Sequence, residues 1–296
     1  MTDPHPNQPR AIPAPAAELA ARFSLLSSSA RPSLGTYLRQ LWQRRFFLVA
    51  FANARITSMY TQARLGQLWQ LLTPLLNAAV YYLLFGLLLR TDRGVENFTA
   101  FLVTGVFVFT FTQRSVINGA NSLNSNLGLI RALHFPRATL PLAYILAEFQ
   151  QMATALLILG LVVLATGEPL TATWLLVPIA VLLQCLFNAG AALVVARIGA
   201  QVRDITQILP FVMRSWLYLS GVFFSIPVFT ADAHGSLRLL LSLNPAAVYI
   251  DLVRSAIIVG HDGIPHAWPL AVAWALVAVI GGFLYFWSAE EKFGRG

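Results

Sequence analysis

The sequence predicts an all-α polytopic membrane protein, and three observations lead to this fold class. Hydrophobic residues make up 57% of the 296 residues and charged residues only 11%, whereas a soluble domain carries about 25% charged residues. Mean hydropathy is +0.67. The apolar runs approach the ~20 residues that a helix needs to cross the hydrocarbon core, and they do not alternate as in a β-barrel. A cytosolic enzyme and a disordered chain are therefore excluded.

We expect six transmembrane helices, an N-terminal amphipathic interface helix and short re-entrant helices before the last span. The predicted spans cover residues 68–89, 98–113, 140–166, 174–196, 205–229 and 268–287. The stretch 236–260 differs because Asn244-Pro245 breaks it and Asp251 and Arg254 interrupt its apolar run. Two short helices that dip into one face of the membrane fit this pattern better than a spanning helix.

The first 66 residues divide into two predicted segments. Residues 1–32 are rich in Pro, Ala and Ser, which is typical of a flexible tail. In residues 33–66, Ser33 is a suitable N-cap for an amphipathic helix over 34–49 that carries arginine and tryptophan. Such a helix suits the bilayer surface, although it could also pack on a soluble partner. The predicted anchors at the interface are Tyr37, Leu41, Trp42, Arg45 and, at the start of the first span, Trp69. Residues 67–296 form the predicted six-span domain.

The distribution of charge predicts the orientation of the chain. The formal charge is +8, from 20 basic and 12 acidic residues. Arginines gather in the N-terminal arm and in the second-to-third and fourth-to-fifth connections, whereas the opposite connections are richer in acidic residues. By the positive-inside rule, both termini are expected in the cytoplasm. We prefer this interpretation of the basic charge to nucleic-acid binding.

The chain lacks the motifs of the common catalytic and nucleotide sites. A P-loop requires a lysine followed by Ser or Thr, but the single lysine, Lys292, precedes Phe293. The five histidines are scattered without metal-ligand spacing, and Cys185 is the single cysteine. We therefore expect no catalytic residue, no metal and no cofactor in this chain.

Residues 121–137 have the composition of a docking helix. An amide-rich start is followed by an apolar middle and by basic residues, which suits a short amphipathic helix inserted in a groove of a cytoplasmic partner. A plain connecting loop is the alternative.

Four strings of sequence together resemble those of a known family. They are Tyr60-Thr-Gln-Ala-Arg-Leu-Gly-Gln-Leu-Trp69 with Pro74, the segment 121–137 with its Phe135-Pro136-Arg137 ending, the turn at Arg203-Asp204, and Leu243-Asn244-Pro245 with Arg254. From about residue 34 to the C-terminus, the chain resembles the permease subunits of type-2 ABC exporters, in the branch that exports lipid-linked polysaccharides. One departure is Ser220-Gly221, where many members have proline after the serine, so the kink of the fifth span is in question.

The resemblance implies a transport subunit and its partners. A homodimer would dock two separate ABC ATPase subunits, which would bind ATP and Mg²⁺. The implied cargo is a polyprenyl-pyrophosphate-linked glycan of the O-antigen, teichoic-acid or galactan type, moved across the bacterial inner membrane. Membrane lipids are the other implied partners of the chain. The implied contacts with the ATPase subunit are Asn126, Leu127, Ile130, Arg131, Phe135, Pro136, Arg137, Arg203 and Asp204. Alternatives are a type-2 exporter of a drug or small lipid and, in another class, a membrane-embedded glycosyltransferase or lipid-modifying enzyme.

Aromatic side chains in two spans suggest a path for sugars, because sugar rings present C–H faces that can lie on aromatic rings. The candidates are Phe107 and Phe111 in the second span, and Phe211, Trp216, Tyr218 and Phe223 in the fifth, together with Arg214. Packing or lipid contact is the alternative for any one ring. Glu148 and Arg214 are ionisable at membrane depth, and we expect them to pair with each other, with attraction of a pyrophosphate by Arg214 as the alternative.

Overall fold

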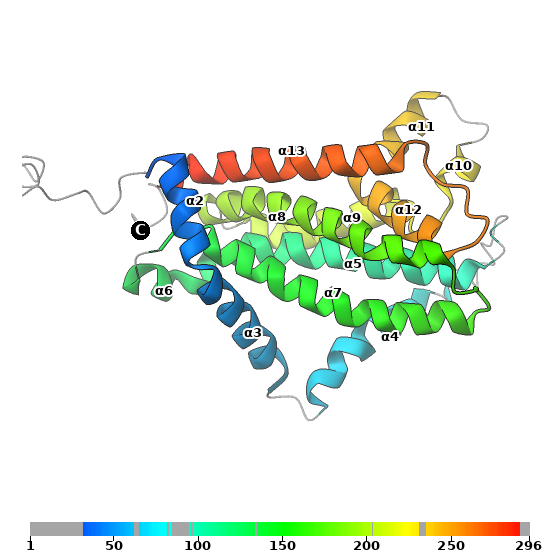
Figure 1. The fold of residues 1–296 in the computed structure, drawn as a ribbon, viewed down its shortest axis with the longest axis horizontal. Helices are drawn as coiled ribbons and strands as arrows, with labels where there is room; N and C mark the ends of the chain where they lie inside the picture. The colour runs from blue at the N-terminus through cyan, green and yellow to red at the C-terminus, as the bar shows by residue number, and fades with distance from the viewer. Residues whose placement is uncertain are drawn as a thin grey trace, which may run out of the picture.

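The fold consists of helices, as the composition predicts. The computed structural model describes residues 32–61, 65–81, 83–84, 95, 97–133, 135–202, 204–230 and 235–290, and these residues contain no strand. Four long helices run side by side along the molecule: α5 (Phe98–Asn121), α7 (Thr139–Ala165), α8 (Val177–Gln201) and α13 (Ala267–Trp287), as Figure 1 shows. The prediction of an all-α polytopic fold is confirmed.

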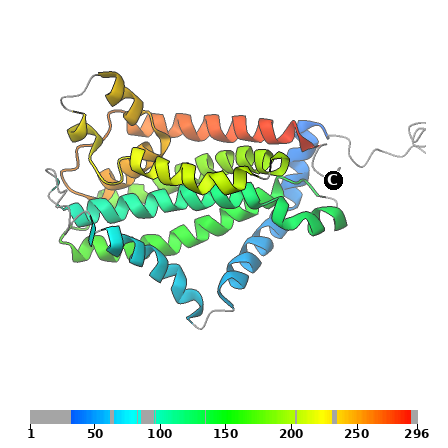
Figure 2. The same ribbon diagram turned by 180° about the vertical axis from the view of Figure 1, so that it is seen from behind.

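The two ends of this bundle carry different elements. One end holds α2 (Leu34–Gln43), α6 (Leu127–Ala132) and the end of α13, and we name it the α6 end. The other holds α10 (Ile226–Phe229), α11 (Gly235–Ser242) and α12 (Pro245–Ile257), and we name it the α12 end. The view from behind shows α9 (Ile205–Leu219) crossing between the two ends (Figure 2).

The number of complete spans among the described residues is smaller than the six predicted. Four helices are long and apolar enough to cross a membrane: α5, α7, α13, and α8 together with the 3-10 turn that precedes it, Ala172–Leu176. The bent pair α11–α12 brings the number to five if it is taken as one span. The first predicted span is described as α4 (Trp69–Tyr81), and most of its second half lies outside the described residues. The count of six therefore stays a prediction.

The second span is longer than its sequence pattern predicts. We expected it to end at Gln113, where the apolar run stops, but α5 continues to Asn121. The extra turns are stabilised from within the protein, because small residues allow α8 to approach closely. An added Cβ at Gly119 would meet the side chain and backbone of Ala192. The helix can therefore continue through polar residues, because this part of α5 packs against α8 and does not face lipid.

The amphipathic segment is two helices and not one. α2 ends at Gln43, and α3 (Arg45–Thr61) continues beyond the predicted boundary at residue 49 and packs against α7. The predicted N-cap is confirmed, since the Ser33 hydroxyl accepts the N–H of Thr36 at 3.4 Å. In Figure 1, α3 leaves the α6 end on the α7 side of the bundle, and α4 returns toward the α12 end.

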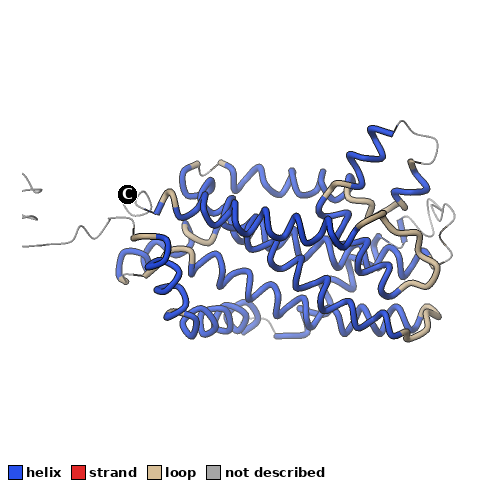
Figure 3. The backbone as a smooth tube through the Cα atoms, turned by 45° about the horizontal axis from the view of Figure 1, so that its top comes forward, coloured by secondary structure: helices blue, strands red, loops and turns tan. Residues whose placement is uncertain are grey.

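The fifth span is interrupted near the α12 end. α9 stops at Leu219, and the chain turns through Gly221 at φ +65° before α10 begins. The left-handed region of backbone conformation favours glycine. Gly221 therefore lets the chain leave the helix at this point without a proline. The predicted break at Asn244-Pro245 is confirmed, and α11 and α12 are bent by 73° relative to each other. The tube in Figure 3 shows these breaks as loops.

The contact between α8 and α13 depends on two glycines. An added Cβ at Gly190 would overlap the backbone of Ala278, and one at Gly282 would overlap the backbone of Gly190. Small residues in such positions let two membrane helices approach closely, so that backbone packs on backbone. The neighbouring Gly281 has no atom within 4 Å of an added Cβ.

This geometry makes adjacent glycines respond differently to the same change. Gly282→Ala should destabilise the protein by about 1–3 kcal/mol, because an added methyl group overpacks the contact with α8. Gly281→Ala is the matched control and should leave the stability unchanged or slightly higher, since alanine favours the helix. Thermal unfolding of the two variants in the same detergent measures this. Equal melting temperatures would show that the helices do not meet at Gly282.

Candidate functional site

The segment 121–137 forms a short helix that is fastened by its amides. Asn124 Nδ2 donates to the carbonyl of Gly199 at the end of α8, at 2.8 Å. Asn126 Nδ2 donates to the carbonyl of Ser122 at 2.7 Å and to the hydroxyl of Tyr144 on α7 at 2.9 Å. The amide-rich start therefore ties α6 to the ends of the neighbouring helices.

The apolar residues of this helix face in two directions. Leu129 and Ile130 pack against the buried cluster at the α6 end, together with Phe135. Leu127 remains 39% exposed and Leu133 50% exposed. α6 therefore has an inner face that holds it to the bundle and an outer face that remains open.

The structure separates the predicted ATPase contacts into two groups. Leu127, Arg131 and Asp204 are exposed at or near the α6 end. The side chains of Asn126, Ile130, Phe135, Pro136 and Arg137 are half-buried or buried, and several hold the segment in place. Arg203 lies outside the described residues.

Glu290 connects three parts of the chain at this end. Its carboxylate accepts the Tyr37 hydroxyl at 2.9 Å and the main-chain N–H of Arg137 at 2.9 Å. The Arg137 guanidinium donates to the Glu290 main-chain carbonyl, and the N–H of Ala138 donates to the Tyr37 oxygen at 3.1 Å. We name Tyr37, Arg137 and Glu290 the Glu290 clamp. It joins α2, the end of the 121–137 segment and the residues after α13.

Burial controls the ionisation of this clamp. Burial raises the pKa of Glu290 above that of an ordinary glutamate, while the N–H of Arg137, the Tyr37 hydroxyl and the Arg137 charge act in the opposite direction. Burial and the Glu290 carboxyl also raise the pKa of Tyr37, so its hydroxyl stays a donor. Since the folded pKa of Glu290 exceeds its unfolded pKa, its contribution to stability is complete below the unfolded value and is lost as pH rises through the folded value.

Sequence reasoning missed Glu290 and gave Tyr37 a different environment. Glu290 follows the last span in a short charged tail, and nothing local distinguishes it from its neighbour. Tyr37, expected at the bilayer interface, is 1% exposed inside the protein. Leu41 is half-buried against the same cluster, whereas Trp42 is 69% exposed and lies under the Arg45 guanidinium at 5.1 Å. Trp69 is exposed at the start of α4.

A chain of polar side chains crosses from α3 to α7 at membrane depth. Arg55 on α3 donates to Asn118 Oδ1 on α5 at 3.3 Å and lies over the Tyr144 ring at 3.6 Å. Asn118 Nδ2 donates to Glu148 Oε1 on α7 at 2.7 Å. Arg114 on α5 donates to Gln151 Oε1 at 3.3 Å. These residues hydrogen-bond one another inside the bundle, and the buried Arg55 Nε makes no hydrogen bond within the described part of the chain.

The expected pairing of Glu148 with Arg214 is wrong. Glu148 is buried between α7 and α5, where Asn118 is its hydrogen-bonding partner. Arg214 lies on the exposed side of α9, and among the described residues it has no hydrogen bond or ion pair. Similar depth in the membrane suggests the pair, but Glu148 is buried against α5 while Arg214 is exposed on α9.

The candidate path residues do not meet at one place. Phe107 and Phe111 are buried in the core. Trp216 donates to Asn244 Oδ1 at 2.8 Å and meets the edge of Phe109. The remaining candidates lie on or near the outer side of α9: Phe211 at 70% exposure, Tyr218 at 50%, Arg214, and the buried Phe223, whose ring centroid is 5.4 Å from that of Tyr218.

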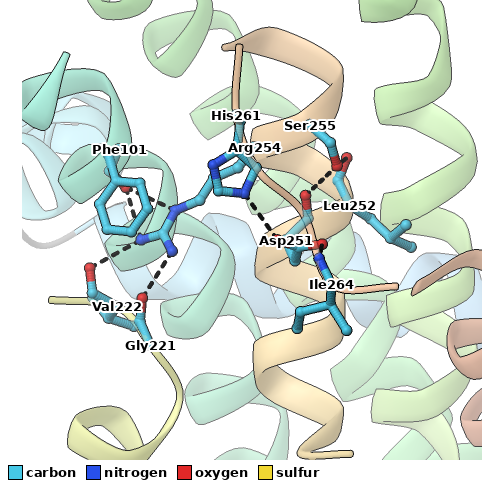
Figure 4. A network of polar contacts seen from close by, with 9 residues as sticks. All are labelled: Phe101, Gly221, Val222, Asp251, Leu252, Arg254, Ser255, His261 and Ile264. Carbon is cyan, nitrogen blue, oxygen red and sulfur yellow. Dashed lines mark hydrogen bonds and ion pairs between the residues drawn. The ribbon is translucent and has the colours of Figure 1, made fainter. Parts of the chain in front are cut away.

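A second polar network holds the α12 end together (Figure 4). The Arg254 guanidinium donates to the carbonyls of Phe101 on α5 and of Gly221 and Val222 in the break after α9, at 2.7–3.1 Å. Asp251 accepts the N–H of Ile264 at 2.8 Å and pairs with His261 at 2.8 Å. Arg254 therefore provides the donors that the broken helix lacks. The sequence alone shows Arg254 as an interruption in an apolar run and as part of the family resemblance, and it does not reveal these carbonyl partners.

The described residues contain no group of three His, Cys, Asp or Glu side chains placed to hold a metal ion. The polar clusters bind backbone groups and one another. These clusters hold the helices together. The outer side of α6 and the outer side of α9 remain exposed.

The comparisons with known proteins agree on one family. Residues 47–258 match the sequence model described as ABC-2 type transporter. The O-antigen export system permease protein RfbA of Myxococcus xanthus is 28% identical over 258 residues, which are 86% of this chain and 94% of that protein. RfbA of Klebsiella pneumoniae is 25% identical over 60% of this chain and 68% of its own length. The polysialic acid transport protein KpsM of Escherichia coli is 23% identical over 80% of this chain and 90% of its own length.

The Glu290 clamp predicts a local loss of stability when one acceptor oxygen is removed. Glu290→Gln retains the size of the side chain but offers a single acceptor oxygen to two donors. Losing one such hydrogen bond costs about 1–3 kcal/mol, so amide exchange in α2 should become about fivefold faster or more. Hydrogen–deuterium exchange measures this over residues 34–43.

Glu168→Gln is the matched control. The Glu168 carboxylate also accepts two hydrogen bonds, from Asn97 and from the N–H of Val259, but at the α12 end. It should leave exchange in α2 unchanged. Equal exchange of α2 in both variants and in the unaltered protein would contradict the clamp.

Proposed function

Because the chain belongs to the ABC-2 type transporter family, we propose that it is the transmembrane subunit of an ATP-driven exporter of a lipid-linked polysaccharide. The printed names of its relatives, which concern O antigen and polysialic acid, support this class of cargo. The cargo is a glycan carried on a polyprenyl pyrophosphate, and the membrane is the bacterial inner membrane. The chain is a transport subunit and not an enzyme.

The nucleotide is bound by separate ATPase subunits. The sequence contains no P-loop, so ATP and Mg²⁺ belong to the partner. The outer side of α6, with Leu127 and Arg131, is the proposed docking surface. Its apolar and basic residues suit a groove in a soluble subunit, while its inner face is already held by Leu129 and Ile130. The observation that carries this proposal is that α6 is fastened to the bundle on one side and open on the other.

The arrangement of α9 supports a homodimer. Leu209, Met213 and Leu217 form one buried seam, while Phe211, Arg214 and Tyr218 are exposed on other sides of the helix. An arginine at membrane depth faces protein or water and not lipid. A second copy opposite α9 provides that environment, and the exposed aromatic rings then face the path between the two copies.

The arginine-rich connections support the orientation in which the α6 end and both termini lie in the cytoplasm. The α12 end, with its broken helices, then faces the outside of the cell. This orientation places the docking surface on the side where ATP is available.

Docking on α6 can be tested with charge substitutions. The purified chain alone should hydrolyse no ATP. Leu127→Asp and Arg131→Glu should weaken coassembly with the ATPase subunit about tenfold or more, since a central interface residue is worth ~2 kcal/mol or more. Coassembly is measured by copurification at matched membrane abundance, and export of the polymer is recorded alongside.

Leu170→Asp is the control, because Leu170 is 72% exposed in the loop after α7, at the α12 end. It should coassemble normally. Normal coassembly and normal export by both α6 variants would remove this helix from the interface.

A further inference from the structure

A polar cavity opens between α4, α5 and α9, at the depth of the hydrocarbon core of the membrane. Its volume is about 320 Å³, within the range of small-ligand sites. The polar residues on its wall are Asn77 on α4 and Thr110, Gln113, Arg114 and Asn118 on α5. Gln113 is eight residues before the end of α5, so it lies roughly 12 Å from that end.

Two of these side chains lack a hydrogen-bonding partner in the part of the chain that the structure describes. Among the described residues, neither the Asn77 nor the Gln113 side chain makes a hydrogen bond, whereas Arg114 and Asn118 are held by Gln151, Arg55 and Glu148. A carboxamide without a partner in hydrocarbon costs several kcal/mol. The two amides therefore require water or a polar ligand, and Arg114 and Asn118, each held by its own partners, form a fixed wall beside them.

The chemistry of the wall indicates the kind of ligand. Each carboxamide offers two donors and one acceptor with two lone pairs. A hydroxyl both donates and accepts, so neighbouring hydroxyls on a sugar ring match this set. The only carboxylate among the contacts described for this wall, Glu148, is already bound by Asn118. A smaller cavity behind Arg114, of about 30 Å³, has room for roughly two waters and not for a sugar.

We propose that this cavity is a sugar-binding subsite, in which Asn77 and Gln113 hydrogen-bond hydroxyl groups of the glycan while Arg114 and Asn118 fix the wall. This inference rests on the proposed function. It adds hydrogen bonds between the cavity wall and the glycan to any contact that the glycan makes with aromatic rings. Gln113, Arg114 and Asn118 lie in the half of α5 nearer the α6 end, while Val106 and Leu217 extend the wall toward the α12 end.

The ligand can be identified with two probes on the reconstituted exporter. ATP hydrolysis by the complex of this chain with its ATPase subunit is measured in vesicles against lipid-linked glycan extracted from the producing cells, and against undecaprenyl diphosphate without sugar. Gln113→Leu should raise the half-maximal concentration of the glycan-bearing probe about tenfold and leave the response to the bare diphosphate unchanged. Gln43→Leu, on the exposed side of α2, is the control for the same chemical change outside the cavity.

The outcomes separate the two proposals. Equal shifts for both probes would overturn a sugar site in favour of a phosphate site, and no shift for either would remove Gln113 from the ligand. If the unaltered complex responds to neither probe, the polysaccharide function fails and the sugar assignment fails with it.

A second measurement concerns the cavity itself and does not depend on the cargo. In a Cys185→Ser background, Gln113→Cys should react with a charged thiol reagent, while Leu157→Cys should not. Leu157 is 72% exposed on the apolar side of α7, where lipid excludes the reagent. Failure of the cysteine at 113 to react would overturn a water-filled subsite even if transport is altered.

Discussion

No water reaches the hydrocarbon core of a membrane, so every backbone N–H and C=O group there must find a partner within the protein. This constraint explains the long helices and also the places where they break. At the end of α9, the carbonyls of Gly221 and Val222 have no helical partner and are bound by the buried Arg254. Asn244 performs a similar task between α11 and α12, since it accepts from Ala246 and Trp216 and donates to the carbonyl of Leu219. Irregular backbone is tolerated at the α12 end because single polar side chains replace the missing helix.

The same constraint makes polar residues without partners informative. Asn118 hydrogen-bonds both Arg55 and Glu148, so these three residues act as part of the packing between α3, α5 and α7. Arg214, Asn77 and Gln113 have no such partners among the described residues, and we infer that a path for water or glycan and a second copy of the chain supply them.

α3 lies between the segment that carries α6 and the proposed subsite. Phe47 on α3 meets the Phe135 ring at 5.6 Å, and Arg55 on the same helix reaches Asn118 in the wall of the cavity. A continuous set of contacts therefore joins the segment that carries α6 to the proposed subsite.

Hydropathy alone predicts the fold class and the long helices, because burial in lipid and burial in protein both require apolar runs. The break at Asn244-Pro245 and the cap at Ser33 are also predictable, since both are local. What the sequence does not reveal depends on distant contacts. α5 continues past Gln113 because α8 packs on it, Glu148 selects Asn118 in place of Arg214, and Glu290 binds a tyrosine 253 residues earlier in the chain.

The central claim is that the α6 end faces the cytoplasm, where an ATPase subunit docks, and that the α12 end faces outward. The most direct measurement is labelling of single cysteines with a membrane-impermeant maleimide in a Cys185→Ser background. Gly35→Cys on α2, at the α6 end, has open space around the new side chain, and Val259 after α12 is 58% exposed. In intact cells, once any outer membrane has been opened to the reagent, Val259→Cys should react at once and Gly35→Cys only after the inner membrane is permeabilised. The reverse order would contradict this account.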